Sequence, residues 1–239
     1  MKKDSNALHW KTFELDAVYL RNDPEVVREA MRKNPEVFEH ASKELKANRK
    51  FVLQVVKQHG SSLRCVSKNL KCDREVVLEA VKQNGCALKF AAEELHDDRK
   101  LVFEAVKKCG AALVHASAKL HGDRELVLLA VESAGRALQY ASAVLRRDRD
   151  IVLTAVRQNG RALEHAFCEL QADRQIVLEA VKNQGTALMY AENKLQSDRQ
   201  IVLEAVKNDG EALAFASDEL RVDRQIVLEA VKDEQESSD

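Results

Sequence analysis

The chain of 239 residues contains only two prolines and one tryptophan, and no apolar run approaches the roughly 18 residues that span a bilayer. Its first residues, MKKDSN, lack the apolar stretch of a secretory signal. Lysine and arginine number 38 against 39 acidic residues, so the charge balance does not favour a nucleic acid or a membrane surface as partner. These absences predict a soluble cytoplasmic protein without a membrane partner, with the nucleus as the alternative compartment.

The motifs of common catalytic and metal sites are also lacking. No Gly-rich phosphate loop, HExxH, GxSxG or Walker-type GK[ST] occurs. Five cysteines without a CxxC spacing argue against a zinc site and a disulfide framework, and predict reduced thiols. The nearest approach to a reactive pair is His165 and Cys168, three residues apart on a predicted helix, without an orienting third group. We therefore expect no enzymatic activity, no metal and no cofactor.

What the sequence does contain is a repeat of 25 residues. Aspartate recurs with this period from Asp23 to Asp223, with Asn48 filling one place, and arginine follows it everywhere except at Pro24. Glycine stands twelve residues after each start up to Asp198, apart from Pro35 in the first repeat. The decapeptide DRQIVLEAVK occurs at 173–182, 198–207 and 223–232. Self-similarity of this kind is typical of a solenoid.

Each repeat reads as two helices. The aspartate suits a helix N-cap, and the glycine suits the left-handed conformation past a helix end. Between them, Ile176, Val177, Leu178, Ala180 and Val181 spread over about 200° of a helical wheel, which one partner cannot cover. The following pattern xALxxAxxxL has one narrower apolar face and predicts a shorter second helix covering the first.

Because two short helices cannot bury such an arc alone, the repeats are expected to stack on their neighbours. The fold class is therefore all-α, an α-solenoid of about eight and a half two-helix repeats. We assign residues 1–22, which include Trp10 and Asp16, to an N-terminal capping segment, and 23–222 to eight tandem repeats. Residues 223–239 form a C-terminal capping helix and a frayed acidic tail.

The stretch DREVVLEAVKQNGCALKFAAEEL at 73–95 resembles the repeat of a family called domain of unknown function 4116. The joint pattern of DR, AV, G, AL and L recurs over residues 23–232. The resemblance implies an all-helical repeat array and carries no activity or site residues. The repeat that begins at Asp23 departs most from the pattern, with Asp-Pro in place of Asp-Arg and a second proline.

Two columns of equivalent residues have a functional and a structural interpretation. The first, which could stack ligands or simply border the core, comprises His40, Cys65, Phe90, His115, Tyr140, His165, Tyr190 and Phe215. The second could track phosphates, as modular nucleic-acid-binding repeats do, or form a ladder with carboxylates of adjacent repeats. It comprises Arg49, Arg74, Arg99, Arg124, Arg149, Arg174, Arg199 and Arg224. The structural interpretation is favoured for both columns.

A partner-specific surface is sought where the repeats differ. In the repeat 98–122 the outward positions of the second helix hold only small apolar side chains, and at 129 leucine replaces the commonest glutamate. Arginines outnumber acids just beyond. Small apolar residues ringed by arginines are typical of a protein-docking patch. Neutral sequence drift on a surface without a binding role gives the same pattern. The candidate contact residues within 111–161 are Ala111, Val114, Ala118, Leu129, Arg136, Arg146, Arg147, Arg157 and Arg161.

The sequence thus predicts a non-enzymatic scaffold that presents an extended helical-repeat surface to another protein. The alternative is a modular nucleic-acid-binding array that uses the arginine column. Self-association through apolar ridges is a third possibility.

Overall fold

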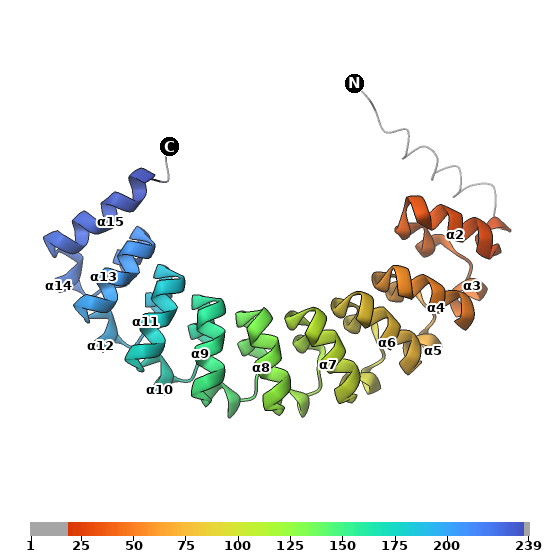
Figure 1. Cartoon of the computed structure of the whole chain (residues 1–239), viewed down its shortest axis with the longest axis horizontal. Coiled ribbons are helices and arrows are strands. Elements are labelled where there is room, and N and C mark those ends of the chain that lie inside the picture. Colours follow the sequence, from red (N-terminus) through yellow and green to blue (C-terminus); the bar gives the residue numbers. More distant parts are fainter. Residues whose placement is uncertain (1–18, 237–239) are drawn as a thin grey trace, which may run out of the picture. The chain divides into compact units, whose positions relative to one another are not determined.

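The computed structural model describes residues 19–236, and within this range every regular element is a helix (Figure 1). The chain divides into two compact units, one ending at Lys108 and the other beginning at Cys109. Each unit is a row of similar helical repeats. An all-α repeat architecture is therefore confirmed. The predicted capping segment lies outside the described residues, Trp10 and Asp16 included, except for its last turn, η1 (Leu20–Asn22).

The long helix of each repeat is an α-helix that begins one residue after the repeated aspartate or asparagine. In the first unit these helices are α2 (Pro24–Lys33), α4 (Arg49–Gln58), α6 (Arg74–Gln83) and α7 (Arg99–Lys108). In the second unit they are α8 (Arg124–Ser133), α9 (Arg149–Gln158), α11 (Arg174–Asn183), α13 (Arg199–Asn208) and α15 (Arg224–Glu236). Within each unit consecutive long helices lie side by side in chain order (Figure 1). The acidic residues after Lys232 continue α15 to Glu236.

The long helix starts and packs as the sequence predicts. Asp173 caps α11, because its Oδ1 accepts hydrogen bonds from the backbone N–H groups of Gln175 at 2.9 Å and Ile176 at 3.0 Å. Ile176 and Val181 have no exposed surface, and their equivalents in α9 and α13 are buried equally completely. Complete burial of such a side chain stabilises the fold by about 1.5–3 kcal/mol, so the wide apolar arc holds the row of repeats together.

The second half of the repeat differs from the single short helix that the sequence predicts. It starts as a six-residue 3₁₀ helix, and a break that contains extended residues, such as Ala166 and Phe167, then separates this helix from a second short piece. The 3₁₀ helices are η2 (Pro35–His40), η3 (Gly60–Cys65) and η4 (Gly85–Phe90) in the first unit, then η6 (Gly110–His115), η8 (Gly135–Tyr140), η10 (Gly160–His165), η11 (Gly185–Tyr190) and η12 (Gly210–Phe215).

The second short piece ends just before the next long helix. It is α3 (Lys43–Ala47), α5 (Lys68–Lys71) and η5 (Glu93–Asp97) in the first unit. In the second unit it is η7 (Leu120–Gly122), η9 (Leu145–Arg147), α10 (Cys168–Gln171), α12 (Asn193–Gln196) and α14 (Asp218–Arg221). The break explains how the chain turns twice within 25 residues without long loops.

The repeated glycine does not adopt the predicted left-handed conformation, and no described glycine has a positive φ. The extended residue before it, such as Asn159 at φ −153°, makes the turn instead. The glycine is needed for space. A Cβ atom on Gly135 would come within 2.4 Å of the carbonyl oxygen of Ala155, and a Cβ atom on Gly185 within 2.3 Å of that of Ala205. The Gly and Ala columns therefore belong to one close contact between neighbouring repeats.

Hydrogen bonds between repeats accompany this contact. The Gly160 backbone N–H donates to Oδ1 of Asn183 at 2.6 Å, and Nδ2 of Asn183 donates to the carbonyl oxygen of Arg157 at 3.0 Å. Farther along the chain, the backbone N–H of Phe167 donates to the carbonyl oxygen of Arg146 at 3.1 Å. Equivalent bonds recur in both units. Each one satisfies a backbone group that the breaks between short helices would leave unpaired.

The thiols do not all follow the sequence prediction. Cys65, Cys72 and Cys168 are free. Cys86 and Cys109 are disulfide-bonded, so the prediction of reduced thiols is wrong for these two residues.

Candidate interaction surface

The arginine column pairs with the aspartate that starts the next repeat. In the second unit, Nε of Arg124 donates to Oδ2 of Asp148 at 2.8 Å, and its Nη2 lies 3.3 Å from Oδ2 of Asp150. The equivalent ion pairs are Arg49–Asp73, Arg74–Asp98, Arg149–Asp173, Arg174–Asp198 and Arg199–Asp223. Arg99 and Arg224 are also exposed at the first turn of their helices. These distances describe a structural ladder along each unit.

The aspartate of this ladder serves two neighbours at once. While Oδ2 of Asp148 accepts from Arg124, its Oδ1 accepts from the backbone N–H groups of Asp150 at 3.0 Å and Ile151 at 3.2 Å. The hydrogen bond from the Arg124 guanidinium lowers the pKa of the Asp148 carboxyl, burial opposes this effect, and the backbone donors lower the pKa further. One carboxylate therefore starts a helix and ties it to the preceding repeat.

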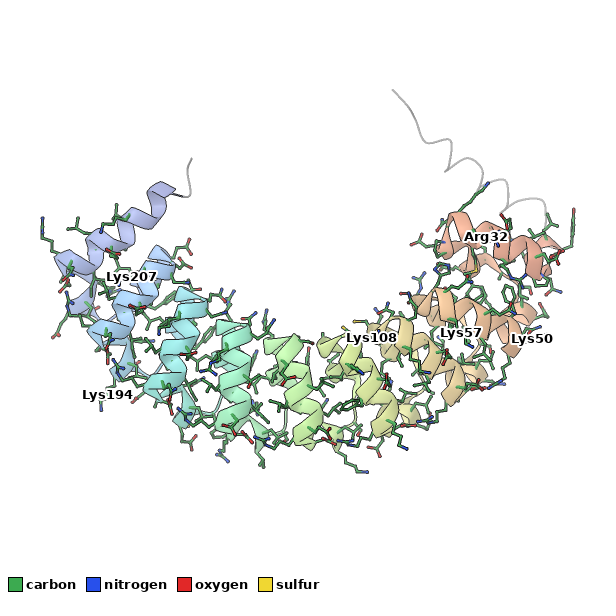
Figure 2. The ribbon with its side chains drawn as sticks, viewed as in Figure 1. Arg32, Lys50, Lys57, Lys108, Lys194 and Lys207 are labelled. Carbon is green, nitrogen blue, oxygen red and sulfur yellow. The ribbon has the colours of Figure 1, made fainter. Side chains whose placement is uncertain are left out.

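A second row of charged residues lies on the exposed side of the long helices. A cation lies near the C-terminal end of most of them, such as Lys57 on α4 and Lys207 on α13 (Figure 2). Lys57 Nζ lies 3.9 Å from Glu79 Oε2 of the next repeat, and Lys207 Nζ lies 3.5 Å from Glu204 Oε1. In α8 this pattern is replaced by Leu129 and Glu132, as the sequence shows.

The structure divides the predicted contact residues between two faces. The exposed Ala111 and Val114 belong to η6, which packs against the buried side of α8. Leu129 is half-buried on α8 and lies about 130° around the helix from the centre of its buried side, at 100° per residue. Val114 therefore lies on the face that the 3₁₀ helices and the short pieces after them form, which we call the short-segment face. Leu129 lies on the opposite face, which the long helices form and which we call the long-helix face. The two residues lie on different faces, and the predicted contact site stays a prediction.

The predicted arginines divide in the same way. Arg157 lies on the long-helix face, where its Nε is 2.8 Å from Oε2 of Glu179. Arg136 and Arg161 are exposed on η8 and η10, and Arg161 contacts the Tyr190 hydroxyl, which raises the arginine pKa. Between the faces, the guanidinium carbon of Arg147 lies 3.5 Å from the centre of the Phe167 ring.

Arg146 is half-buried, and its Nε finds no hydrogen-bond partner among the described residues. The exposed Ala118 follows η6 and precedes η7. Most of the predicted contact residues therefore lie on the short-segment face, namely Ala111, Val114, Ala118, Arg136 and Arg161.

The sequence reasoning missed Val144, the residue before η9. Its side chain is 74% exposed, against 37% for Val114 and 41% for Met189. The signal was available, because this position holds a charged residue in most other repeats. Val144 was overlooked because the short segment was treated as one continuous helix, which assigned the outward positions incorrectly after the break.

A groove in the first unit was also missed. It has a volume of about 660 Å³ and runs across η2, η3 and η4, with lining from Glu36, Phe38, Arg64 and Lys89 among others. Nη2 of Arg64 lies 2.8 Å from Oε2 of Glu39 inside it. The hollow arises because three successive repeats place side chains of different length at equivalent outward positions, which one sequence does not reveal as a cavity.

The two histidine-related predictions have different outcomes. His165 ends η10 and Cys168 begins α10, so they do not share a helix as predicted. The Cys168 thiol instead contacts Oε2 of Glu169 at 3.3 Å. The column of histidines and aromatic residues is half-buried at the edge of the core, except for the exposed His40. Burial lowers the pKa of His165, and the charges of Arg136 and Arg146 lower it further against the effect of Glu164.

The described residues contain neither a metal-binding cluster nor a membrane-spanning helix. From residue 19 to 236 no cluster of three or more His, Cys, Asp or Glu side chains is arranged to hold a metal ion. Over the same described part, no helix has the length and apolarity needed to cross a membrane.

The stacked repeats define an all-α tandem-repeat protein, and sequence comparison identifies which one. The chain belongs to the family described as domain of unknown function (DUF4116), whose model matches residues 18–46, 48–96, 98–146, 148–196 and 198–235. The matches extend over both units, so the resemblance predicted from residues 73–95 is confirmed. Comparisons with curated proteins and with solved structures found no match.

Proposed function

We propose that this protein is a non-enzymatic scaffold that binds another protein through the short-segment face of its second unit. The observation that carries the proposal is the exposure of apolar side chains there: Val144 is 74% exposed and Val114 37%. Ala111 and Ala118 are exposed beside Val114 in the chain. Exposed apolar side chains near a rim of arginines are typical of protein contact sites.

The architecture supports this role because it separates stability from recognition. The contacts between repeats use the Gly, Ala, Asp and Arg columns together with buried Val, Ile and Leu. Apart from pairs such as Arg64 with Glu39, the outward positions of the short segments take no part in these contacts. They can therefore vary from repeat to repeat without loss of the fold, as in other solenoids that present extended binding surfaces.

The runner-up, a nucleic-acid-binding array, is less well supported by the geometry. In each ion pair of the ladder the arginine Nε or Nη2 contacts an aspartate of the next repeat, such as Arg174 with Asp198 at 3.1 Å. A phosphate would have to compete with that carboxylate. Self-association through the same apolar side chains remains a variant of the main proposal, with a second copy as the partner.

The proposal is tested by capture of proteins from native lysate on the immobilised chain. We expect Val114→Glu with Val144→Glu to remove the captured partner, because a carboxylate in a docked apolar contact is buried without a partner charge. Met189→Glu is the matched control, since Met189 is 41% exposed at the position equivalent to Val114, three repeats farther along the chain. Leu129→Glu tests the opposite face and should leave capture intact.

Unchanged capture by the Val114 and Val144 variant, with helicity preserved in circular dichroism, would contradict the proposal. Loss of capture with Leu129→Glu alone would move the contact site to the long-helix face.

A further inference from the structure

The groove of the first unit is separate from the proposed contact surface, which belongs to the second unit. Its volume of about 660 Å³ is open to solvent along η2, η3 and η4, and its lining joins three successive repeats. Within this unit η2 packs against η3 and η3 against η4, so the three 3₁₀ helices present a continuous row (Figure 1). A site of this form suits an elongated ligand that crosses the repeats.

Charge changes sign along the groove. At the η2 end, Glu36 is exposed, and among residues 19–236 no cation lies within ion-pair distance of its carboxylate, although, after that of Glu39, its charge helps to raise the pKa of Arg64. In the middle, Arg64 and Glu39 neutralise one another at 2.8 Å. At the η4 end, Nζ of Lys89 lies 4.7 Å from the centre of the Phe90 ring, with no carboxylate paired to it among residues 19–236. The groove is therefore dipolar, negative over η2 and positive over η4.

The groove is lined by polar groups that can form hydrogen bonds with the backbone of an extended ligand. Gln83 Oε1 accepts a hydrogen bond from the Gly60 backbone N–H at 2.9 Å, and the Gln83 amide group lines the groove. His59 and Ser61 add further polar groups beside the ring of Phe90. Polar groups at intervals next to apolar surface bind main-chain groups and an occasional apolar side chain.

We propose that this groove binds an extended peptide segment that carries a cationic side chain over Glu36 and a carboxylate over Lys89. Packed helices lie about 8–10 Å apart, so two steps between repeats span roughly 16–20 Å. An extended chain rises about 3.3 Å per residue, which places the two charges about five to six residues apart in the peptide. The peptide crosses the uncharged middle of the groove, where Arg64 and Glu39 already satisfy one another.

The probe is a six-residue peptide, acetylated and amidated, with Lys first, Asp last and alanine and leucine between. Titrated into the isotope-labelled full chain, it is expected to cause saturable amide shifts confined to residues 35–40, 60–65 and 85–90. A peptide with Gln and Asn in place of Lys and Asp is the control. Because exposed charge pairs contribute about 0.2–1 kcal/mol each and the control lacks both, we expect it to bind about two- to thirtyfold more weakly.

Charge reversal in the protein distinguishes charge-specific recognition of the peptide from non-specific binding. Glu36→Lys or Lys89→Glu alone should weaken binding of the probe by about fivefold or more. Both replacements together invert the groove, and the double variant should prefer the peptide with Asp first and Lys last. Both side chains are exposed, so helicity in circular dichroism should not change.

Three results would overturn the inference. They are the absence of saturable shifts, equal binding of the uncharged control, and equal binding of a peptide with Asp at both ends, which would indicate a simple cationic patch. None of these results bears on capture through Val114 and Val144, because those residues lie in the second unit.

Discussion

Gly160 lies directly against the backbone of Ala180 in the next repeat, where a Cβ atom on the glycine would come within 2.4 Å of the alanine carbonyl oxygen. The same glycine donates its N–H to Asn183 at 2.6 Å. The repeated glycine and the repeated alanine, which look independent in the sequence, thus form the two sides of one contact. This contact, and not the end of a helix, explains why the position holds glycine.

Replacing Gly160 by alanine should therefore destabilise the protein. The clash is with backbone, which cannot move aside cheaply, and overpacking typically costs about 1–3 kcal/mol. Urea unfolding followed by circular dichroism measures the loss. Gly122→Ala is the matched control, since its nearest described neighbour to a Cβ is Ser142 Oγ at 3.9 Å. We expect the control to stay within about 1 kcal/mol of the wild type. Equal effects of the two replacements would show that space at Gly160 is not limiting.

The ladder should make stability depend on pH in the acid range. The pKa of Asp148 is lowered from 3.8 chiefly by its hydrogen bond from Arg124. A lowered carboxyl pKa contributes stability above the unfolded value, and this contribution is lost as the pH falls through the folded value. Asp148→Asn keeps an acceptor for the helix cap but removes the charge. It should lower the urea midpoint at pH 7, and the difference from the wild type should shrink below about pH 4.

Asp218→Asn is the control for this measurement, because Asp218 is 90% exposed beside Arg221. It should change the midpoint little at either pH. A deficit of Asp148→Asn that stays constant from pH 7 to pH 2 would mean that the ion pair contributes nothing and only the cap matters.

The long helices were predictable because the same cap residue and the same apolar positions recur in every repeat. Asp173, Ile176 and Val181 occupy positions whose chemistry permits one role each, a cap or a buried face. The 3₁₀ form of Gly160–His165 was not predictable in this way. Its apolar spacing suits an α-helix equally well, and the choice depends on how closely the glycine must approach Ala180.

The candidate surface was harder to predict than the fold. Val114 and Leu129 both depart from the repeat pattern, but the sequence does not show that η6 separates them to opposite faces of the layer. Val144 was missed because the break after η8, which begins at the extended Ala141, changes which later positions face outward. The exposure of a variable residue depends on local backbone breaks, whereas the core depends on composition that every repeat shares.

The nucleic-acid alternative makes a separate prediction. Mobility-shift titrations with single-stranded and duplex RNA and DNA should show no complex that weakens steeply between 50 and 200 mM salt. Arg174→Gln with Arg199→Gln should instead lower stability, by up to about 1 kcal/mol for each ion pair. A salt-sensitive complex that the double variant loses would reverse this assignment and make the arginine column the binding site.

The most direct test of the proposed scaffold is site-specific photo-crosslinking in native lysate. A photoreactive amino acid replaces Val144, Val114 or, on the long-helix face, Thr154, in otherwise identical chains. The account predicts that positions 144 and 114 crosslink to the same protein and that position 154 does not, because only the short-segment face is docked. Crosslinks from position 154 alone, or none from 144 and 114 with the chain folded, would contradict it.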